Sequence, residues 1–154
     1  MKKSILFLAI GFAATSAYSQ KVGEKEVPTA VKTTFTNKYP KTEVEKWTKE
    51  ADGNYEAEFD YNKQELSVVF DVSGNILETE IEIKASELPK AVSDYCTKNM
   101  AGKKIKETAK ITDAKGTVTY EAEVDDADYI FDANGAFIKK VVEKEDDKDD
   151  EKKK

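Results

Sequence analysis

Apolar and charged residues alternate strictly in two short stretches of the chain. Residues 55–59 read Tyr-Glu-Ala-Glu-Phe, and residues 120–124 read Tyr-Glu-Ala-Glu-Val. Successive side chains of a strand point to opposite faces, so each stretch places its apolar residues on one face and two glutamates on the other. The pattern predicts two half-buried strands, and its recurrence indicates a tandem repeat.

A second pattern, with a period close to four, precedes each of these strands. Apolar residues recur at Val27, Val31, Phe35 and Tyr39, and again 61 positions later at Leu88, Val92, Cys96 and Met100. This spacing predicts two amphipathic helices, each with a proline in its first turn. In the first copy Tyr39-Pro40 should end the helix, because the residue before a proline is pushed out of the helical region.

Four strand-like segments bounded by turn residues follow each helix. They span 43–49, 54–61, 65–71 and 76–83 in the first copy, and 103–112, 117–125, 128–132 and 137–142 in the second. We therefore expect an α+β fold, a tandem repeat of a helix plus four antiparallel strands. The repeats span about 27–83 and 88–142 within one domain of residues 20–142.

The two ends of the chain differ in composition from the predicted domain between them. A basic start and an apolar run over residues 5–14 precede small residues at Ala17 and Ser19, which predicts a signal peptide of residues 1–19. The run is shorter than the roughly 20 residues of a membrane-spanning helix, so we expect no stable membrane anchor and a periplasmic or secreted protein. Residues 143–154 contain no apolar residue and predict a disordered charged tail.

Charge and residue types narrow the possible functions. The formal net charge is −6, there is no histidine, and every basic residue is a lysine. An acidic chain does not suit nucleic acid, whose phosphates need a basic surface. Catalysis commonly uses histidine or an activated cysteine, but Cys96 lies on a predicted helix stripe and is expected to pack in the core. We expect neither an enzyme nor a cofactor, and no metal site, because Asp71 and Asp132 stand in segments typical of turns.

Alternation also assigns residues to the sheet face opposite the helices. The candidate partner-binding residues there are Trp47, Glu56, Glu58, Val69, Ile76, Lys104, Lys106, Ile130 and Phe137. Trp47 is placed outward by counting from Val44, and an exposed aromatic residue would anchor an interface. The alternative is that Trp47 is tucked under a loop or over a strand crossing. We expect Glu56 and Glu58 to form part of a solvated face rather than an acid–base pair.

Several short motifs resemble those of a known family. They are Val27-Pro28-x-x-Val31, Lys38-Tyr39-Pro40, Lys46-Trp47, residues 52–59 and Phe70-Asp71-x-x-Gly74. In these the chain resembles the PepSY-like family of small exported proteins, which is described as similar to the beta-lactamase-inhibitor protein. The resemblance implies one curved antiparallel sheet with two helices packed on its convex face. It also implies a non-enzymatic role in binding or inhibiting envelope or secreted proteins.

Two functional hypotheses follow. The first is an exported binding or inhibitor-like module that recognises an envelope or secreted protein through the open sheet face, and that is a monomer rather than an oligomer. The second is a carrier that holds a small apolar ligand between helices and sheet. Its cavity would be lined by Tyr39, Tyr55, Phe59, Tyr61 and Phe70. A core without a void would favour the first hypothesis.

Overall fold

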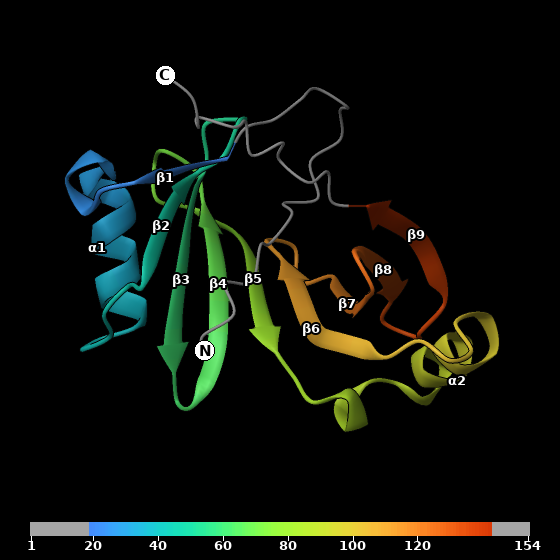
Figure 1. Cartoon of the computed structure of the whole chain (residues 1–154). Helices are drawn as coiled ribbons and strands as arrows, with labels where there is room; N and C mark the ends of the chain where they lie inside the picture. Colours follow the sequence, from blue (N-terminus) through green and yellow to red (C-terminus); the bar gives the residue numbers. More distant parts are fainter. Residues whose placement is uncertain (1–18, 143–154) are drawn as a thin grey trace, which may run out of the picture.

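The computed structural model describes residues 19–142, and this part of the chain forms a nine-stranded sheet and two α-helices (Figure 1). The predicted signal peptide and charged tail lie outside the described residues, apart from Ser19. The helices are α1 (Thr29–Lys38) and α2 (Lys90–Asn99), preceded by the 3-10 turns η1 (Glu24–Glu26) and η2 (Ala85–Glu87). The strands are β1 (Gln20–Val22), β2 (Lys46–Lys49), β3 (Tyr55–Tyr61), β4 (Gln64–Phe70), β5 (Ile76–Glu82), β6 (Ile105–Asp113), β7 (Val118–Val124), β8 (Ala127–Asp132) and β9 (Phe137–Val142).

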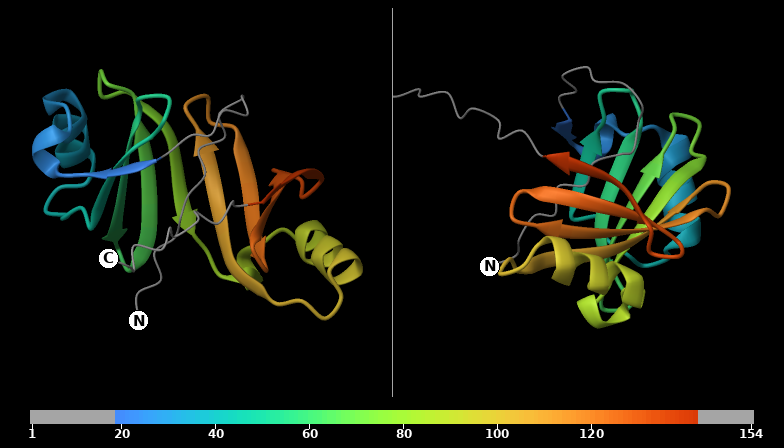
Figure 2. Two further views of the ribbon diagram at one scale, coloured as in Figure 1. Left: turned by 45° about the horizontal axis from the view of Figure 1, so that its top comes forward. Right: turned by 90° about the vertical axis from the view of Figure 1, so that its right-hand side faces the viewer.

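The sheet runs in chain order from β1 to β9, and every neighbouring pair is antiparallel. A helix followed by four strands occurs twice in the element order. The sheet curves strongly, and both helices lie on its outer side (Figure 2). Among the described residues, no helix is long and apolar enough to cross a membrane.

The sequence patterns did not predict β1. Its three residues pair with β2, placing Gln20 opposite Lys49 and Val22 opposite Trp47. Two of the three are exposed, so this strand has almost no apolar alternation to reveal it. It is held by backbone pairing at the edge of the sheet.

Each helix covers its own hydrophobic core. Beneath α1 the core consists largely of aromatic rings, with Phe35 packing edge-on to Phe59 at 4.9 Å and to Trp47 at 5.8 Å between ring centroids. Tyr39 closes the end of this core, 4.7 Å from Phe59. Because these rings fill the space between helix and sheet, this half is held together mainly by burial of aromatic area.

The core beneath α2 has smaller side chains. Val92 and Cys96 from the helix pack with Ala122 and Phe131 from the sheet, and Cys96 is only 6% exposed. The prediction that Cys96 is a packing residue is confirmed. Burial raises the pKa of its thiol, which disfavours the reactive thiolate.

β-Bulges interrupt the alternation along three of the strands. Opposite β4 the register moves from Val69↔Glu78 to Phe70↔Ile76, which leaves Leu77 as an extra residue. Opposite β8 the register moves in the same way, from Ile130↔Lys139 to Phe131↔Phe137. A further shift lies between Ile105 and Glu107 on β6. One extra residue reverses the face of every residue beyond it.

Three residues assigned to the open face therefore lie on the helix side. Ile76 packs against the first core, and Phe137 stacks on Tyr95 with 5.0 Å between ring centroids. The placement of Trp47 was also wrong, since it pairs with Ala57 and is 6% exposed in the first core. Val44 packs against the same core although it lies three residues away, so strict alternation between Val44 and Trp47 fails. Trp47 is thus a core residue and no anchor for a partner.

The turn between β4 and β5 ties the sheet to α1. Asp71 accepts hydrogen bonds from the backbone N–H groups of Ser73 and Asn75, at 2.8 and 2.9 Å. This geometry confirms that the Asp71 segment is a turn. Gly74 follows with φ of +84°, and a Cβ there would lie 2.7 Å from the carbonyl oxygen of Ala30 on α1. The turn therefore needs glycine both for its conformation and for its approach to the helix.

Candidate functional site

The open face is the side of the sheet opposite α1 and α2. Strand pairing places Glu56, Glu58, Val69, Glu80 and Ile130 on it. Cross-strand partners share a face, and the rows Thr48–Glu56–Val69–Glu78 and Lys46–Glu58–Ser67–Glu80–Ile111 run across its first half. No helix in the described part of the chain covers this face (Figure 2). Carboxylates therefore stand on the concave side of the sheet.

Curvature brings side chains from distant strands together on the open face. The carboxyl of Glu80 on β5 interacts electrostatically with Glu56 on β3, Glu121 on β7 and Asp128 on β8. Glu78, also on β5, interacts with Lys139 on β9. A flat sheet would separate β5 from β9 by about 19 Å, because neighbouring strands are about 4.8 Å apart. The action of Lys139 on Glu78 therefore indicates that the face is concave. The expectation of a solvated face was wrong for Glu56 and Glu58, which are buried.

Glu56 and Glu58 have different partners on this face. The hydroxyl of Ser67 donates to Oε1 of Glu56 at 2.6 Å, and the ammonium of Lys46 lies 2.7 Å from Oε1 of Glu58. Both glutamates are buried, with exposed fractions of 3% and 6%. Burial, reinforced by the carboxylates of Glu50 and Glu58, raises the pKa of Glu56 to about 8 despite the hydrogen bond from Ser67. Glu56 is therefore largely protonated at neutral pH.

Glu80 lies at the centre of the open face, on the middle strand of the nine. Its side chain is buried, at 4% exposure, and within the described chain its Oε1 has no hydrogen-bond partner. Burial and then the surrounding carboxylates, first among them Glu121, raise its pKa well above the ordinary value. An unsatisfied buried oxygen costs free energy, so Glu80 is unfavourable for stability at this position.

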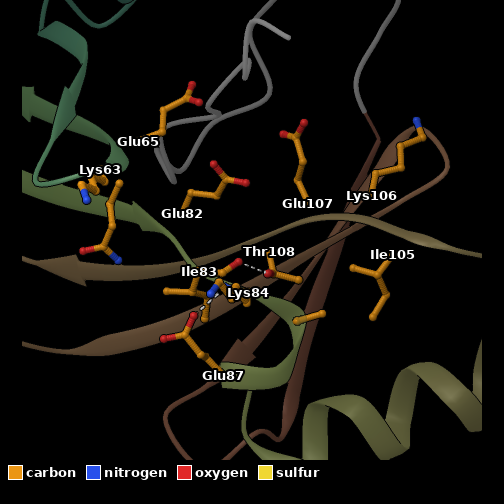
Figure 3. Close-up of a pocket in the computed structure, with 12 residues that line it drawn as sticks. Lys63, Glu65, Glu82, Ile83, Lys84, Glu87, Ile105, Lys106, Glu107 and Thr108 are labelled. Atoms are coloured by element: carbon orange, nitrogen blue, oxygen red, sulfur yellow. Dashed lines mark hydrogen bonds between the residues drawn. The ribbon is translucent and has the colours of Figure 1, made fainter. Parts of the chain in front are cut away.

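A hollow of about 440 Å³ opens where the two halves of the sheet meet (Figure 3). Glu65, Glu82 and Glu107, from β4, β5 and β6, line it and lie on the same side in Figure 3. Burial and then the carboxylates of Glu82 and Asp60 raise the pKa of Glu65 to about 7. The floor is fixed by Thr108, whose hydroxyl donates to the carbonyl of Ile83 at 2.6 Å. Lys63, Lys84 and Lys106 line the same hollow, so its lining is of mixed charge.

Of the remaining predicted site residues, two lie on the open face and two lie away from its centre. Val69 and Ile130 lie buried on the open face, as the alternation predicts. Lys104 is exposed in the loop before β6. Lys106 is the bulged residue of β6 and forms ion pairs with Glu123 at 3.1 Å and Asp126 at 3.2 Å, near the edge of the face. The lysines therefore do not gather at the centre of the open face.

Alternation alone did not single out the residues that matter most at this centre. Alternation also puts Glu80 on the open face, but Glu80, Ser67 and Ile111 are not among the candidate site residues of the sequence analysis. The signal available was the run of alternating glutamates at 78, 80 and 82, which resembles the run at 56 and 58. Their convergence depends on sheet curvature, which the alternation does not encode.

Within residues 19–142 no group of three or more His, Cys, Asp or Glu side chains is positioned to hold a metal ion. The carboxylates of the open face are spread over rows rather than gathered on one point.

Comparison with known proteins identifies the family. The family described as "Putative beta-lactamase-inhibitor-like, PepSY-like" matches residues 13–78 and 53–139. No curated protein matches the chain.

Solved structures share the fold at low identity. A DUF2874 family protein from Bacteroides uniformis is 19% identical and has a TM-score of 0.66, with 75% of this chain and 88% of that chain covered. A Bacteroides eggerthii protein described as a "putative periplasmic" protein is 15% identical, with the same coverage and a TM-score of 0.67. A BLIP-like protein from Bacteroides fragilis is 22% identical, with 77% and 90% covered and a TM-score of 0.61. From the family match, the chain belongs to the PepSY-like, beta-lactamase-inhibitor-like family.

Proposed function

We propose that the protein is an exported, non-enzymatic module that binds an envelope or secreted protein through the open face of its sheet. The observation that carries this proposal is the composition of that face. Buried aliphatic side chains, Val69, Ile111 and Ile130, stand beside buried carboxylates where no described helix covers the sheet. Apolar side chains beside polar groups on a concave face resemble the composition of binding surfaces, in which polar groups fix the orientation of the partner.

The family context supports export and binding. The family is described as beta-lactamase-inhibitor-like, and the relative from Bacteroides eggerthii is described as periplasmic. The predicted signal peptide of residues 1–19 agrees with that location. Two overlapping family matches along one chain also support a tandem repeat, which would give the open face two similar halves.

The other functional classes receive less support. The residues expected to line a ligand cavity pack on one another, with Tyr39 centred 5.2 Å from Tyr61 and 4.7 Å from Phe59, so they form core rather than a cavity. Glu56 has the raised pKa of a general acid, but its carboxylate already accepts from Ser67 and the hollow at the junction does not reach it. A binding role needs neither a cavity nor a free acid.

Photo-crosslinking tests the proposal by position. A benzophenone amino acid would replace Thr119, which lies on the open face opposite Ile111 and Asp132, or Thr97, which is exposed on α2. We expect a specific envelope protein, identified by mass spectrometry, to be crosslinked from position 119 and not from position 97. The purified partner should then bind the wild-type chain and lose affinity for Ile130→Lys. Crosslinks from position 97 alone would place the interface on the helix side and overturn the proposal.

A further inference from the structure

The sheet ends at β9, and no strand of the described chain covers the outer edge of β9 (Figure 1). Three of the four large apolar side chains that are exposed in residues 19–142 lie on this strand, namely Phe137, Ile138 and Val142. The opposite edge of the sheet differs, because β1 has only three residues and carries none of these side chains. An uncovered edge with exposed apolar residues is a surface on which another strand can pair.

The first half of the chain shows what covers an edge of this kind. β5 and β9 occupy the same place in the two halves, since the turn before each begins with an aspartate that accepts from two backbone N–H groups. Each strand also begins at a register shift, opposite Phe70 for β5 and opposite Phe131 for β9. The outer edge of β5 is covered by β6, which pairs with it antiparallel from Glu78 to Glu82. A strand is therefore the kind of element that fits the matching edge of β9.

Side-chain exposure differs between these two strands. None of the seven residues of β5 is exposed, whereas four of the six residues of β9 are. β5 has a paired strand on both sides, and β9 has one on a single side in the described chain. A strand added beside β9 would cover apolar surface of Ile138 and Val142, and burial of that surface would favour the pairing.

The backbone groups of β9 are oriented for such a pairing. The N–H of Asp132 donates across the β8–β9 hairpin at 2.9 Å, so the backbone of Asp132 points towards β9. Backbone groups point alternately to the two sides along antiparallel strands. The register of Ile130 with Lys139 therefore turns the backbone of Lys139 towards β8. The N–H and C=O groups of Lys140 and Val142 then point outward.

The pairing of β5 with β6 gives the same orientation independently. The N–H of Ile83 donates to the carbonyl of Thr108 at 3.0 Å, so the backbone of Ile83 points towards β6. By alternation the backbones of Thr79 and Ile81 point the same way. These two residues precede Lys140 and Val142 by 61 positions, the spacing between the two halves.

The charge of β9 indicates what kind of strand fits its edge. Its charged residues are Lys139 and Lys140, and neither forms an ion pair within residues 19–142. The ammonium of Lys140 lies 5.4 Å from the ring centroid of Tyr129, and Lys139 acts on Glu78 across the open face. A second copy of β9 would add two further lysines to the same edge, whereas a strand with carboxylates would balance the charge.

We propose that the outer edge of β9 binds an extended segment of a partner protein, which pairs antiparallel with β9 and places carboxylates opposite Lys139 and Lys140. The segment would lie beside β9 as β6 lies beside β5, with backbone hydrogen bonds at Lys140 and Val142. In strand addition of this kind the main chain provides affinity and the side chains provide specificity. The edge is distinct from the open face, so the inference goes beyond the proposed function and does not rest on it.

Three matched peptides test the inference on the exported form of the chain. The first is acetyl-Thr-Val-Glu-Glu-Val-Thr-amide, which reads the same in both directions, and the second has glutamine in place of both glutamates. The third is the first peptide with N-methyl groups on both glutamates, which keeps the charges but removes N–H groups from both edges of the peptide. Amide hydrogen exchange is followed by NMR with each peptide in large excess.

The first peptide should slow exchange of the amides of Lys140 and Val142 severalfold. The amides of Lys139 and Val141 should change little, because their N–H groups point towards β8. The glutamine peptide should protect Lys140 and Val142 much less, and the N-methylated peptide should not protect them. General attraction between opposite charges would not select alternate amides of one strand.

Variants test the role of the two lysines. Lys139→Gln and Lys140→Gln should each weaken the protection given by the glutamate peptide, while the small effect of the glutamine peptide stays the same. Lys98→Gln removes the same charge from an exposed position of α2 and should have no effect. Native spectra of the three variants would show that they fold.

Several outcomes would overturn the inference. Equal protection by the glutamate and glutamine peptides, or protection by neither, would show that the edge does not select an acidic strand. If the amides of Lys140 and Val142 are already protected in the dilute protein alone, its own chain covers the edge. If protection instead grows with protein concentration, together with a dimer in sedimentation, the occupant is a second copy. Crosslinking from position 119 tests the open face separately and would stand under each of these results.

Discussion

Single buried side chains carry much of the energy of this fold, and Trp47 is an example. Its ring packs edge-on against Phe35 and lies 6.3 Å from Phe70, so it connects α1 to two parts of the sheet. Replacing it leaves a cavity as well as losing apolar burial. Trp47, which the sequence analysis predicted to anchor an interface, thus stabilises the fold instead.

We expect Trp47→Ala to lower the free energy of unfolding by about 3 to 5 kcal/mol, the range for a fully buried large aromatic residue. Phe137→Ala is the matched control, because Phe137 lies on the same side of the sheet but is 41% exposed, and it should cost about 1 to 2 kcal/mol. Urea unfolding followed by circular dichroism would measure both. A cost below about 1 kcal/mol for Trp47→Ala would contradict its place in the core.

Glu56 should make stability fall as the pH rises. The pKa of Glu56 is about 8 in the folded chain, because burial disfavours its charged form, against 4.5 as the ordinary value. Between these two values the folded chain keeps a proton that the unfolded chain has released, so the free energy of unfolding decreases, with a limiting slope of about 1.4 kcal/mol per pH unit. Asp71 and Asp113 have lowered pKa values. The stability that their carboxylates contribute to the fold is therefore lost only as the pH falls below their ordinary pKa of 3.8.

We therefore expect the free energy of unfolding of Glu56→Gln, measured by urea titration, to change less between pH 5 and pH 8 than that of the wild type. Glu80 adds a slope of the same sign, so some pH dependence should remain in this variant. Glu24→Gln, at an exposed position, should reproduce the wild-type slope. An unchanged slope in Glu56→Gln would show that the carboxyl is ionised in the folded chain at neutral pH.

At the scale of elements, the turns between strands hold the sheet against the helices. The β4–β5 turn touches α1 at Gly74, and the β8–β9 turn touches α2 at Gly135, where a Cβ would lie 2.8 Å from the Cβ of Ala91. Gly53, in the β2–β3 turn, has a similar φ of +88° but open space around it. A substitution at Gly53 therefore measures the cost of backbone strain alone, whereas the same substitution at Gly74 adds the cost of contact with α1.

Gly53→Ala should cost about 1 kcal/mol, since an L-residue is strained at positive φ. Gly74→Ala should cost about 1 to 3 kcal/mol more, because the added methyl group meets the backbone of Ala30 and must push the turn away from α1. Thermal unfolding of the two variants side by side gives the difference. Equal losses would mean that the turn moves freely relative to the helix.

Element types were predictable from sequence, but faces were predictable only as far as the first bulge. Both helices and the eight longer strands follow from the period of their apolar residues, and Val69 and Ile130 lie on the predicted face. Ile76 and Phe137 were misplaced because each stands beyond one extra residue, and Trp47 was misplaced because alternation from Val44 does not hold. Each of these bulges stands at a pair of adjacent apolar residues, Ile76-Leu77 and Phe137-Ile138, and apolar spacing alone does not tell which of the two faces the helix.

At the scale of the molecule, burial of the open face could not be predicted either. Glu56 and Glu58 were expected on a solvated face, because alternation says which face a residue takes and nothing about the curvature of that face. In the folded chain Glu121 on β7 and Asp128 on β8 come close enough to Glu80 on β5 to act on its pKa, which depends on the curvature of the whole sheet. The candidate site thus depends on both halves of the chain holding their relative positions.

The two halves share a sheet but not a core. The buried residues of the first core come from α1 and β2–β4 and their flanking turns, and those of the second from α2, β7 and β8 and the residues beside them, without overlap. β5 and β6 join them through one antiparallel pairing from Glu78 to Glu82. The first core contains several aromatic rings in edge-on or tilted contact, whereas the buried residues of the second include Cys96, Met100 and a single ring, that of Phe131. Local unfolding should therefore follow this boundary.

Val31→Ala and Val92→Ala form a matched test of that boundary, because each valine is fully buried in its own helix and 61 positions separate them. Each substitution should cost about 0.5 to 2 kcal/mol through loss of buried methyl groups. In native-state hydrogen exchange, Val92→Ala should accelerate exchange mainly in β7–β9 and Val31→Ala mainly in β2–β4, with the second half opening at lower free energy in both. Equal acceleration across all strands in either variant would show instead that the pairing of β5 with β6 makes the molecule one cooperative unit, and that the open face forms and melts as a whole.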